Sequence, residues 1–165
     1  MKLKSTFAAL ASGIAAMSLS VNPAQAVTYT TIVNDWNGYC AGTGGSTLQG
    51  AAAIQWNCNG KSDEEWYFGL TTDHIGNAAE VITNKYSDLC LGVGASLSNG
   101  AKAMQYTCNG AIDEKWYRIE EWPGVYQWKN VYSGKCLGTG SSMTGGTNLI
   151  QYTCDAGQDQ YWISS

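Results

Sequence analysis

Charged residues are scarce in this chain, since Asp, Glu, Lys and Arg together make up 13% of its 165 residues. Glycine and two aromatic types are abundant by contrast, with 20 glycines, 7 tryptophans and 10 tyrosines. This balance favours short strands and tight turns over helices. No convincing 3.6-residue hydrophobic period follows residue 26, so the chain is predicted to be all-β.

Positive charge and metal ligands are scarce as well. The chain has 9 basic residues against 13 acidic ones, which gives a net charge of −4. A negative surface argues against nucleic acid or an anionic membrane as a partner. His74 is the one histidine and no Cys-x-x-Cys pair occurs, so we expect neither a metal site nor a cofactor.

The first 26 residues have the pattern of a secretory signal peptide. Lys2 and Lys4 make a positive start, Phe7–Leu19 is mostly apolar and small, and Ala24-Gln25-Ala26 is a small-x-small cleavage signature. A retained anchor is the alternative, but this apolar run is short for a membrane span. We expect cleavage after Ala26 and a secreted, single-domain mature chain of 139 residues, Val27–Ser165, with a net charge of −6.

Three copies of one segment follow, and they align without a gap over residues 34–66, 84–116 and 130–162. Self-similarity at a regular period is the signature of a repeat architecture. All three copies carry the same residue at ten of the 33 positions. These positions are Asn34, Cys40, Gly42, Gly44, Ser46, Gly50, Gln55, Cys58, Asp63 and Trp66 of the first copy and their counterparts in the other two.

All six cysteines fall at matching places, two in each copy and 18 residues apart. A bond within each copy is the only local pairing that treats the copies alike, and an exported chain can keep such bonds. Each bond is worth roughly 3 kcal/mol in the chain-entropy model. Zinc binding is the weaker alternative, given the cysteine spacing. The predicted disulfides are Cys40–Cys58, Cys90–Cys108 and Cys136–Cys154.

Each copy is predicted to hold short strands joined by Gly- and Ser-rich turns. A unit of three or four short strands cannot bury its apolar face alone, so three units are expected to share one core about a pseudo-threefold axis. Trp66, Trp116 and Trp162, which close the copies, are expected to point inward. Strands are predicted at residues 29–33, 53–57, 66–70, 80–83, 103–107, 116–120, 125–129, 149–153 and 162–164.

Three short motifs recur in the copies: Cys-Leu-Gly at 90–92 and 136–138, Gln-Tyr-Thr-Cys at 105–108 and 151–154, and endings of the form Asp-x-x-Trp. They resemble the ricin B-type lectin repeat, whose Q-x-W hallmark is kept as Gln160-Tyr161-Trp162. The resemblance covers essentially the whole mature chain. It implies a β-trefoil over residues 27–165, with repeats at about 29–70, 79–120 and 125–165.

The resemblance also indicates a sugar site in each copy. A flat aromatic face takes the C–H side of a sugar ring, and fixed amides and carboxylates take its hydroxyls. The aromatics could instead merely cover the sheet, and the aspartates could brace turns. Gln55, Gln105 and Gln151 alternate to the opposite face and are predicted to be structural. The candidate carbohydrate-binding residues are Trp56, Asp63, Glu64, Tyr106, Asp113, Glu114, Tyr152, Asp159 and Gln160.

One departure from the family affects all three candidate sites. Sugar-binding members typically have Asp two residues after the first cysteine, where this chain has Gly42, Gly92 and Gly138. Either the Asp63-type residue takes over or binding has been lost. The first copy also has Ala41 and Asn57 where the others have Leu and Thr, so the second and third sites rank above the first.

No catalytic constellation is evident, and we expect no enzymatic activity. There is no G-x-S-x-G elbow, and His74 falls in a turn-forming connector, residues 71–77. Adjacent acids such as Glu64-Glu65 and Glu120-Glu121 would point to opposite faces of a strand, so neither pair flanks a bond. The Gly-x-Gly steps, such as residues 42–44, lack the helix that a phosphate site needs and are predicted to be turns.

The leading hypothesis is a secreted, monomeric lectin with up to three weak sites that act by avidity on a galactose-type sugar or polysaccharide. The alternative is a protein-binding trefoil, such as a protease inhibitor or surface adhesion protein. Its contact segment would be the exposed loop Glu120–Tyr126, with Trp122 and Pro123. A third hypothesis is an accessory chain that delivers a separate enzyme to its substrate.

Overall fold

Short strands dominate the computed structural model, which describes residues 26–164. These residues form twelve strands and three single-turn 3-10 helices. The first third holds β1 (Thr30–Asn34), β2 (Cys40–Gly42), β3 (Ile54–Trp56), η1 (Ser62–Glu64) and β4 (Glu65–Thr72). The second holds β5 (Ala78–Asn84), β6 (Cys90–Gly92), β7 (Met104–Tyr106), η2 (Ile112–Glu114) and β8 (Lys115–Trp122). The last holds β9 (Val125–Asn130), β10 (Cys136–Gly138), β11 (Ile150–Tyr152), η3 (Gln158–Gln160) and β12 (Trp162–Ser164).

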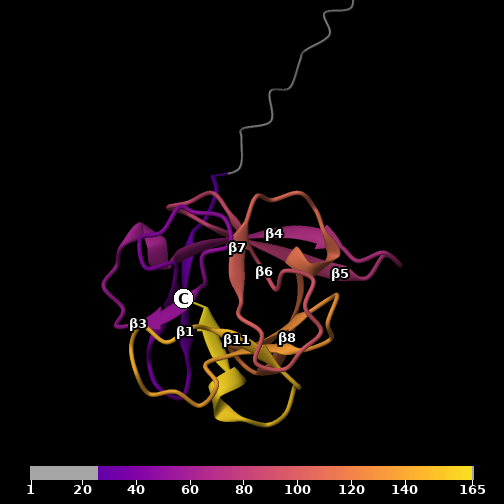
Figure 1. Ribbon diagram of the computed structural model, residues 1–165. Helices are drawn as coiled ribbons and strands as arrows, with labels where there is room; N and C mark the ends of the chain where they lie inside the picture. Colours follow the sequence, from indigo (N-terminus) through magenta and orange to yellow (C-terminus); the bar gives the residue numbers. More distant parts are fainter. Residues whose placement is uncertain (1–25, 165) are drawn as a thin grey trace, which may run out of the picture.

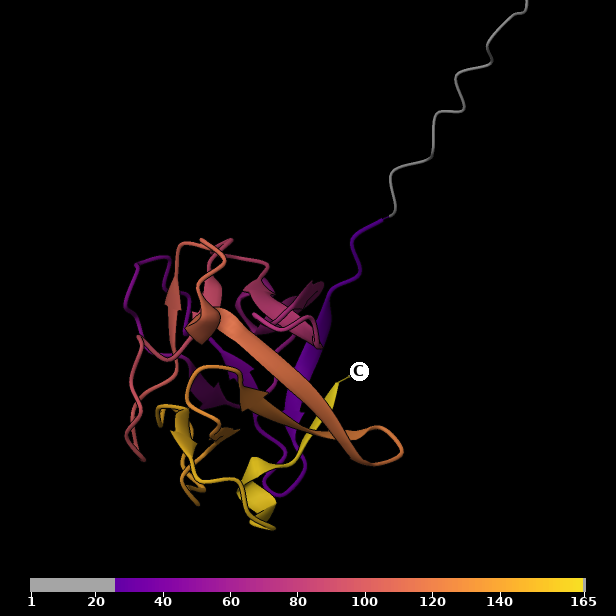
Figure 2. The same ribbon diagram turned by 90° about the vertical axis from the view of Figure 1, so that its right-hand side faces the viewer.

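The first and last strands of each third close into a barrel. Around the ring, β1 pairs with β4, β4 with β5, β5 with β8, β8 with β9, β9 with β12, and β12 with β1, always antiparallel. Closure removes the free sheet edges of these six strands. The remaining strands form the hairpins β2–β3, β6–β7 and β10–β11. This is the predicted β-trefoil. Figure 1 shows its three thirds about a common centre, and Figure 2 shows β12 beside β1.

The three hairpins meet through a ring of backbone hydrogen bonds. Ala53 N donates to Ala103 O at 2.9 Å, Ala103 N to Leu149 O at 2.9 Å, and Leu149 N to Ala53 O at 2.8 Å. All three residues are fully buried. Each hairpin therefore depends on the other two for its backbone hydrogen bonds, as expected for units that cannot fold alone.

The core is built on the tryptophans that close the repeats. Trp66, Trp116 and Trp162 have no exposed surface, which confirms their predicted inward position. Each indole N–H donates to the carbonyl of the residue after the first cysteine of its own repeat, at 2.8–2.9 Å. A buried indole needs such a partner because its N–H would otherwise lose its hydrogen bond to water. The carbonyl acceptors belong to Ala41, Leu91 and Leu137.

The glutamines before the exposed aromatics tie each repeat to the preceding one. Gln105 is fully buried, and its Nε2 donates to the carbonyls of Ser46 and Leu48, at 2.8 and 3.3 Å. Gln55 binds Ser142 and Thr144 of the third repeat in the same way, and Gln151 binds Ser96 and Ser98 of the second. The prediction that these glutamines are structural is confirmed.

All three predicted disulfides are present, with Cα–Cα distances of 4.9–5.0 Å. The nine predicted strands also form, with shifted ends. The sequence reading missed β2, β6 and β10, because three-residue strands that end in glycine resemble turns. The segment Glu120–Tyr126 is not the predicted loop, since it forms the end of the β8–β9 hairpin, which extends from the body in Figure 2.

The predicted signal peptide, residues 1–26, lies almost entirely outside the described residues. Within residues 26–164, no helix has the length and apolar character needed to cross a membrane. His74 lies exposed in the turn between β4 and β5, as predicted.

Candidate functional site

Each repeat carries one hollow at the same place, between the end of its second strand, its third strand and the loop that leads into its 3-10 helix. The hollows measure about 380, 340 and 400 Å³ in the first, second and third repeats. These volumes lie at the lower end of the range for small-molecule sites. The hollows contain the predicted aromatic and acidic residues, which are Trp56, Asp63 and Glu64, then Tyr106, Asp113 and Glu114, then Tyr152, Asp159 and Gln160.

The aspartates hold a turn with one carboxylate oxygen and leave the other open. Oδ2 of Asp63 accepts from Gly45 N at 3.0 Å, and Asp113 and Asp159 accept in the same way from the amides of Ala95 and Ser141. Within residues 26–164 no hydrogen bond occupies Oδ1 of any of the three. The two interpretations of these residues are therefore compatible, since a half-buried carboxylate that braces a turn is also fixed in position as an acceptor.

The aromatic side chains differ in how much of the ring is open. Trp56 and Tyr152 are each 46% exposed, whereas Tyr106 is half-buried. The Tyr106 hydroxyl lies 3.6 Å from Met104 Sδ, close to Gly94. An open ring face favours the first and third hollows over the second. The sequence had ranked the second and third sites highest, because it could not show which way each ring turns.

The acid or amide that follows each aspartate is buried. Glu64 is 1% exposed, and its Oε2 accepts from the amides of Asn59 and Gly60, at 2.8 and 3.2 Å. Glu114 likewise accepts from Asn109 N at 3.1 Å. These side chains shape the loop that walls the hollow, a role that the sequence analysis did not assign. Their predicted role as sugar ligands stays a prediction, and Glu64 retains one buried oxygen, Oε1, without a partner among the described residues.

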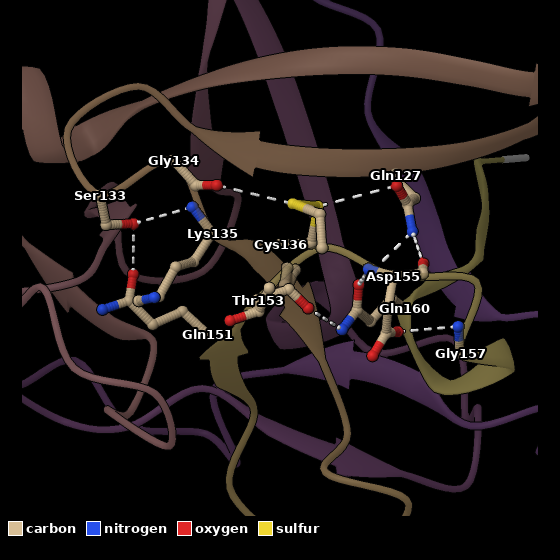
Figure 3. Close-up of a disulfide and its surroundings, with 12 residues drawn as sticks. Gln127, Ser133, Gly134, Lys135, Cys136, Gln151, Thr153, Asp155, Gly157 and Gln160 are labelled. Carbon is tan, nitrogen blue, oxygen red and sulfur yellow. Dashed lines mark hydrogen bonds between the residues drawn. A yellow bond between two sulfur atoms is a disulfide. The ribbon is translucent and has the colours of Figure 1, made fainter.

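The third repeat shows how the wall of a hollow is fixed. In Figure 3 the disulfide Cys136–Cys154 joins β10 to the segment after β11, beside the side chain of Gln160. Gln160 Nε2 donates to Thr153 O at 2.9 Å, and its Oε1 accepts from Asp155 N at 3.2 Å. The loop that joins Tyr152 of β11 to Asp159 of η3 is therefore held by a covalent bond and by a buried amide. Such a loop loses little conformational entropy on binding a ligand.

The glycine that replaces the expected acid lies where a side chain would be crowded. A Cβ atom on Gly42 would lie 3.2 Å from both Asp63 O and Glu64 Cγ. On Gly92 it would lie 3.2 Å from Asp113 O, and on Gly138 it would lie 3.1 Å from Asp159 Oδ2. The departure seen in the sequence thus reflects a close approach of two segments in all three repeats.

The carboxyl groups with the clearest pKa shifts lie outside the hollows. The Tyr117 hydroxyl, which donates to Asp73, holds the pKa of that carboxyl well below its usual range. Burial raises the pKa of Glu80, and the neighbouring Arg118 opposes the rise. Neither acid lines a hollow that carries an exposed aromatic. No group of three or more Cys, His, Asp or Glu side chains within residues 26–164 could hold a metal ion.

Comparison with known proteins gives one family match. Residues 28–162 match the model of the ricin-type β-trefoil lectin domain. No curated protein sequence is significantly similar to the chain.

Three solved structures illustrate the structural likeness. The designed threefold-symmetric protein ThreeFoil has a TM-score of 0.76 at 29% identity, over 82% of this chain and 96% of that one. The exo-β-1,3-galactanase 1,3Gal43A from Clostridium thermocellum has a TM-score of 0.77 at 26% identity, over 85% of this chain but 30% of the enzyme. The ricin B-like lectin of Macrolepiota procera, solved with lactose, has a TM-score of 0.70 at 16% identity, over 87% of this chain and 99% of that one.

Proposed function

The chain belongs to the family of ricin-type β-trefoil lectin domains, and from this premise we propose that it is a secreted lectin that binds glycan polymers through up to three weak sites. Family membership supports a carbohydrate-binding role. Secretion rests on the signal-peptide pattern of residues 1–26. The proposal includes that the protein is a monomer and that it does not catalyse a reaction of the sugar it binds.

The observation that carries the proposal is the pairing of an aromatic side chain with an aspartate carboxylate in each hollow. In the third hollow these groups are the exposed Tyr152 ring and the Asp159 carboxylate. A ring face receives the C–H side of a sugar, and a carboxylate accepts hydrogen bonds from two neighbouring hydroxyls. The same pair recurs as Trp56 with Asp63 in the first hollow.

The ligand class that we propose is a galactose-type sugar or a polysaccharide that contains it. Support comes from the lactose bound to the Macrolepiota procera lectin and from the exo-β-1,3-galactanase, 30% of which matches this chain in structure. Each hollow is small and open, so one sugar unit is expected to bind weakly. Three hollows on one rigid barrel gain from avidity on a polymer, roughly 100-fold or more if the chain can reach two of them.

Retention on a panel of soluble and insoluble polysaccharides, β-1,3-galactan among them, tests this proposal. The oxidised wild-type protein is compared with the double variant Trp56→Ala, Tyr152→Ala, which removes the two open ring faces. We expect wild type to be retained on at least one polymer, the double variant to lose at least 10-fold in affinity, and the polymer to bind more tightly than its monosaccharide.

The matched control is Trp122→Ala, because Trp122 is similarly exposed, at 44%, and lines none of the hollows described above. Equal affinity for a polymer and its monosaccharide would show that the sites do not bind a polymer by avidity. Lack of binding to every sugar would reject the lectin proposal itself.

A second candidate function is binding of a protein partner through the tip of the β8–β9 hairpin. The hairpin extends from the barrel, and its Trp122 ring packs edge-on against Tyr161, with ring centroids 4.7 Å apart. Exposed aromatic anchors of this kind are common at protein interfaces. Trp122→Ala separates the two functions, since loss of a protein partner with unchanged sugar retention would favour this second function.

A further inference from the structure

A second, smaller hollow adjoins the site of the third repeat. It measures about 180 Å³ and is lined by Trp36, Ser141, Gly157, Gln158 and Asp159. Ser141 and Asp159 also line the main hollow that contains Tyr152. The two hollows are therefore neighbours with a shared wall, and each has its own aromatic side chain.

The aromatic side chain of the second hollow comes from the first repeat. Trp36 lies in the loop between β1 and β2 and is 38% exposed. Two residues that flank Trp36, Asn34 at the end of β1 and Asn37 in the loop, bind this segment to the third repeat. Asn34 Nδ2 donates to Asp159 O at 2.9 Å, and Asn37 Nδ2 donates to Ser142 O at 3.1 Å. The segment that carries Trp36 is thus anchored on both sides to the third repeat.

The shared aspartate offers an acceptor to both hollows. Its Oδ2 is used by Ser141 N at 3.1 Å, which leaves Oδ1 unoccupied among the described residues. Oδ1 faces Gly157, because a Cβ atom added there would lie 2.9 Å from it. The first and second repeats have Lys61 and Ala111 at the position of Gly157. At this position, beside the shared aspartate, the third repeat therefore has a smaller residue than the other two repeats.

The anchor on Ser142 is also particular to this junction. The counterparts of Asn37 are Ser87 and Ser133, whose hydroxyls donate to the glutamines of their own repeats. A serine side chain is too short to make the second bond, which Asn37 makes to the neighbouring repeat in addition to its bond with Gln55. Asn37 thus adds a bond between the first and third repeats that Ser87 and Ser133 do not make at their own junctions.

We propose that the third repeat binds two consecutive sugar units of a glycan, one on Tyr152 and the next on Trp36. The Asp159 carboxylate lies between them and accepts from hydroxyls of either unit. This inference rests on the proposed lectin function and adds to it, because it makes a chain segment the preferred ligand of this repeat. An aromatic ring that receives a second unit strengthens binding of a disaccharide by about 3- to 10-fold over a single unit.

Titration with galactose, lactose and β-1,3-linked galactotetraose tests the inference, together with the mono-, di- and tetrasaccharides of any other polymer that retains the protein. Affinity is measured by calorimetry, and the indole ¹H–¹⁵N signal of Trp36 is followed by NMR. Wild type is expected to bind the longer sugars 3- to 10-fold more tightly than the monosaccharide. Trp36→Ala should remove that gain and leave monosaccharide affinity unchanged, whereas Tyr152→Ala should lower both.

Two further variants keep the test informative. Trp36→Tyr retains a ring, as the counterparts Tyr86 and Tyr132 do, and should preserve most of the gain. Trp122→Ala, with a similarly exposed tryptophan elsewhere, should change nothing. Two results would overturn the second subsite and leave the lectin proposal intact. One is a Trp36→Ala variant that still binds the longer sugars more tightly than the monosaccharide, and the other is a Trp36 indole signal that does not shift with any of the longer sugars. Failure of wild type to bind any of these sugars or polymers would reject both.

Discussion

At the scale of single residues, Asp63, Asp113 and Asp159 combine two roles that sequence reasoning had treated as alternatives. One oxygen of each carboxylate accepts from a turn amide, and the other has no hydrogen-bond partner among the described residues. Identity in all three copies is then expected on structural grounds alone, so it does not by itself indicate binding. The direction of each oxygen is the informative property, and it depends on the turn that follows β2, β6 or β10.

The glycines at the ends of these strands yield a prediction about stability. Gly42→Ala adds a Cβ atom 3.2 Å from the carbonyl oxygen of Asp63, a backbone atom that cannot move aside cheaply. We expect the free energy of unfolding to fall by about 1–3 kcal/mol, as for an overpacked core. Denaturant unfolding measures the change.

Gly145→Ala is the matched control, because its added Cβ would lie 3.4 Å from the nearest atom of the Trp56 ring, an ordinary contact. Equal stability of the Gly42→Ala variant and wild type would show that the two segments separate easily. The absent acid at this position would then need another explanation.

At the scale of the elements, a polar contact joins the turn of the β4–β5 hairpin to β8, in addition to the backbone pairing of β5 with β8. Asp73, in the turn between β4 and β5, accepts from the Tyr117 hydroxyl of β8 and from two amides of its own turn, at 2.8 and 2.9 Å. The Tyr117 hydrogen bond is the main cause that lowers the pKa of Asp73 below its ordinary value of 3.8, although burial opposes it. The contact therefore stabilises the fold only while Asp73 is ionised.

This contact predicts how stability depends on pH. A carboxyl whose pKa is lower in the folded than in the unfolded chain stabilises the fold above its ordinary pKa of 3.8, and that stabilisation is lost as the pH falls below it. Tyr117→Phe should therefore lower the Tm at pH 7, and the difference from wild type should shrink as the pH falls toward 2. Thermal unfolding followed by circular dichroism at pH 7, 4 and 2 checks this.

Tyr67→Phe is the control, since Tyr67 is the counterpart of Tyr117 in β4 and packs edge-on against Tyr29. It should show no such dependence on pH. A Tm difference for Tyr117→Phe that is the same at pH 7 and pH 2 would mean that the hydroxyl acts through packing instead of through the Asp73 carboxylate.

At the scale of the whole molecule, the repeats are held together by bonds that cross between them. The backbone ring of Ala53, Ala103 and Leu149 joins the three hairpins. The buried glutamines add side-chain bonds, so that Gln105 of the second repeat satisfies two carbonyls of the first. Loss of one repeat would leave these groups unpaired in the other two, and we therefore expect the barrel to unfold as one unit.

Gln105→Leu tests the strength of this connection. It removes two donors and one acceptor from a buried site and leaves the Ser46 carbonyl without a partner among the described residues. The Leu48 carbonyl and the Ser87 hydroxyl each lose one hydrogen bond and keep those to Ala51 N and Asn84 Oδ1. We expect a loss of about 3 kcal/mol in the free energy of unfolding, measured by denaturant titration. Gln49→Leu, at an exposed position of the same molecule, should change it by no more than about 0.5 kcal/mol. Similar values for the two variants would contradict the role given to the buried glutamines.

Most of the fold could be predicted because the same sequence pattern recurs in three copies. The matched cysteines gave the disulfide pairs, and the closing tryptophans gave the core, since both are large signals at fixed spacing. The three-residue strands β2, β6 and β10 were missed because they are too short to show alternation and end in glycine. Glu64 and Glu114 were assigned to ligand binding alone, because sequence spacing does not show that their carboxylates turn inward to the amides of Asn59 and Asn109.

The sequence by itself determined the repeat, the all-β class, the disulfide pairs and the aromatic and acidic residues that meet in each hollow, because these depend on residues close together within one copy. The tertiary structure decided which rings lie open, why a side chain in place of Gly42 would be crowded, and that Trp36 of the first repeat borders the site of the third. Those properties depend on contacts between segments far apart in the chain, as between Asn34 and Asp159. Only closure of the barrel brings such segments together.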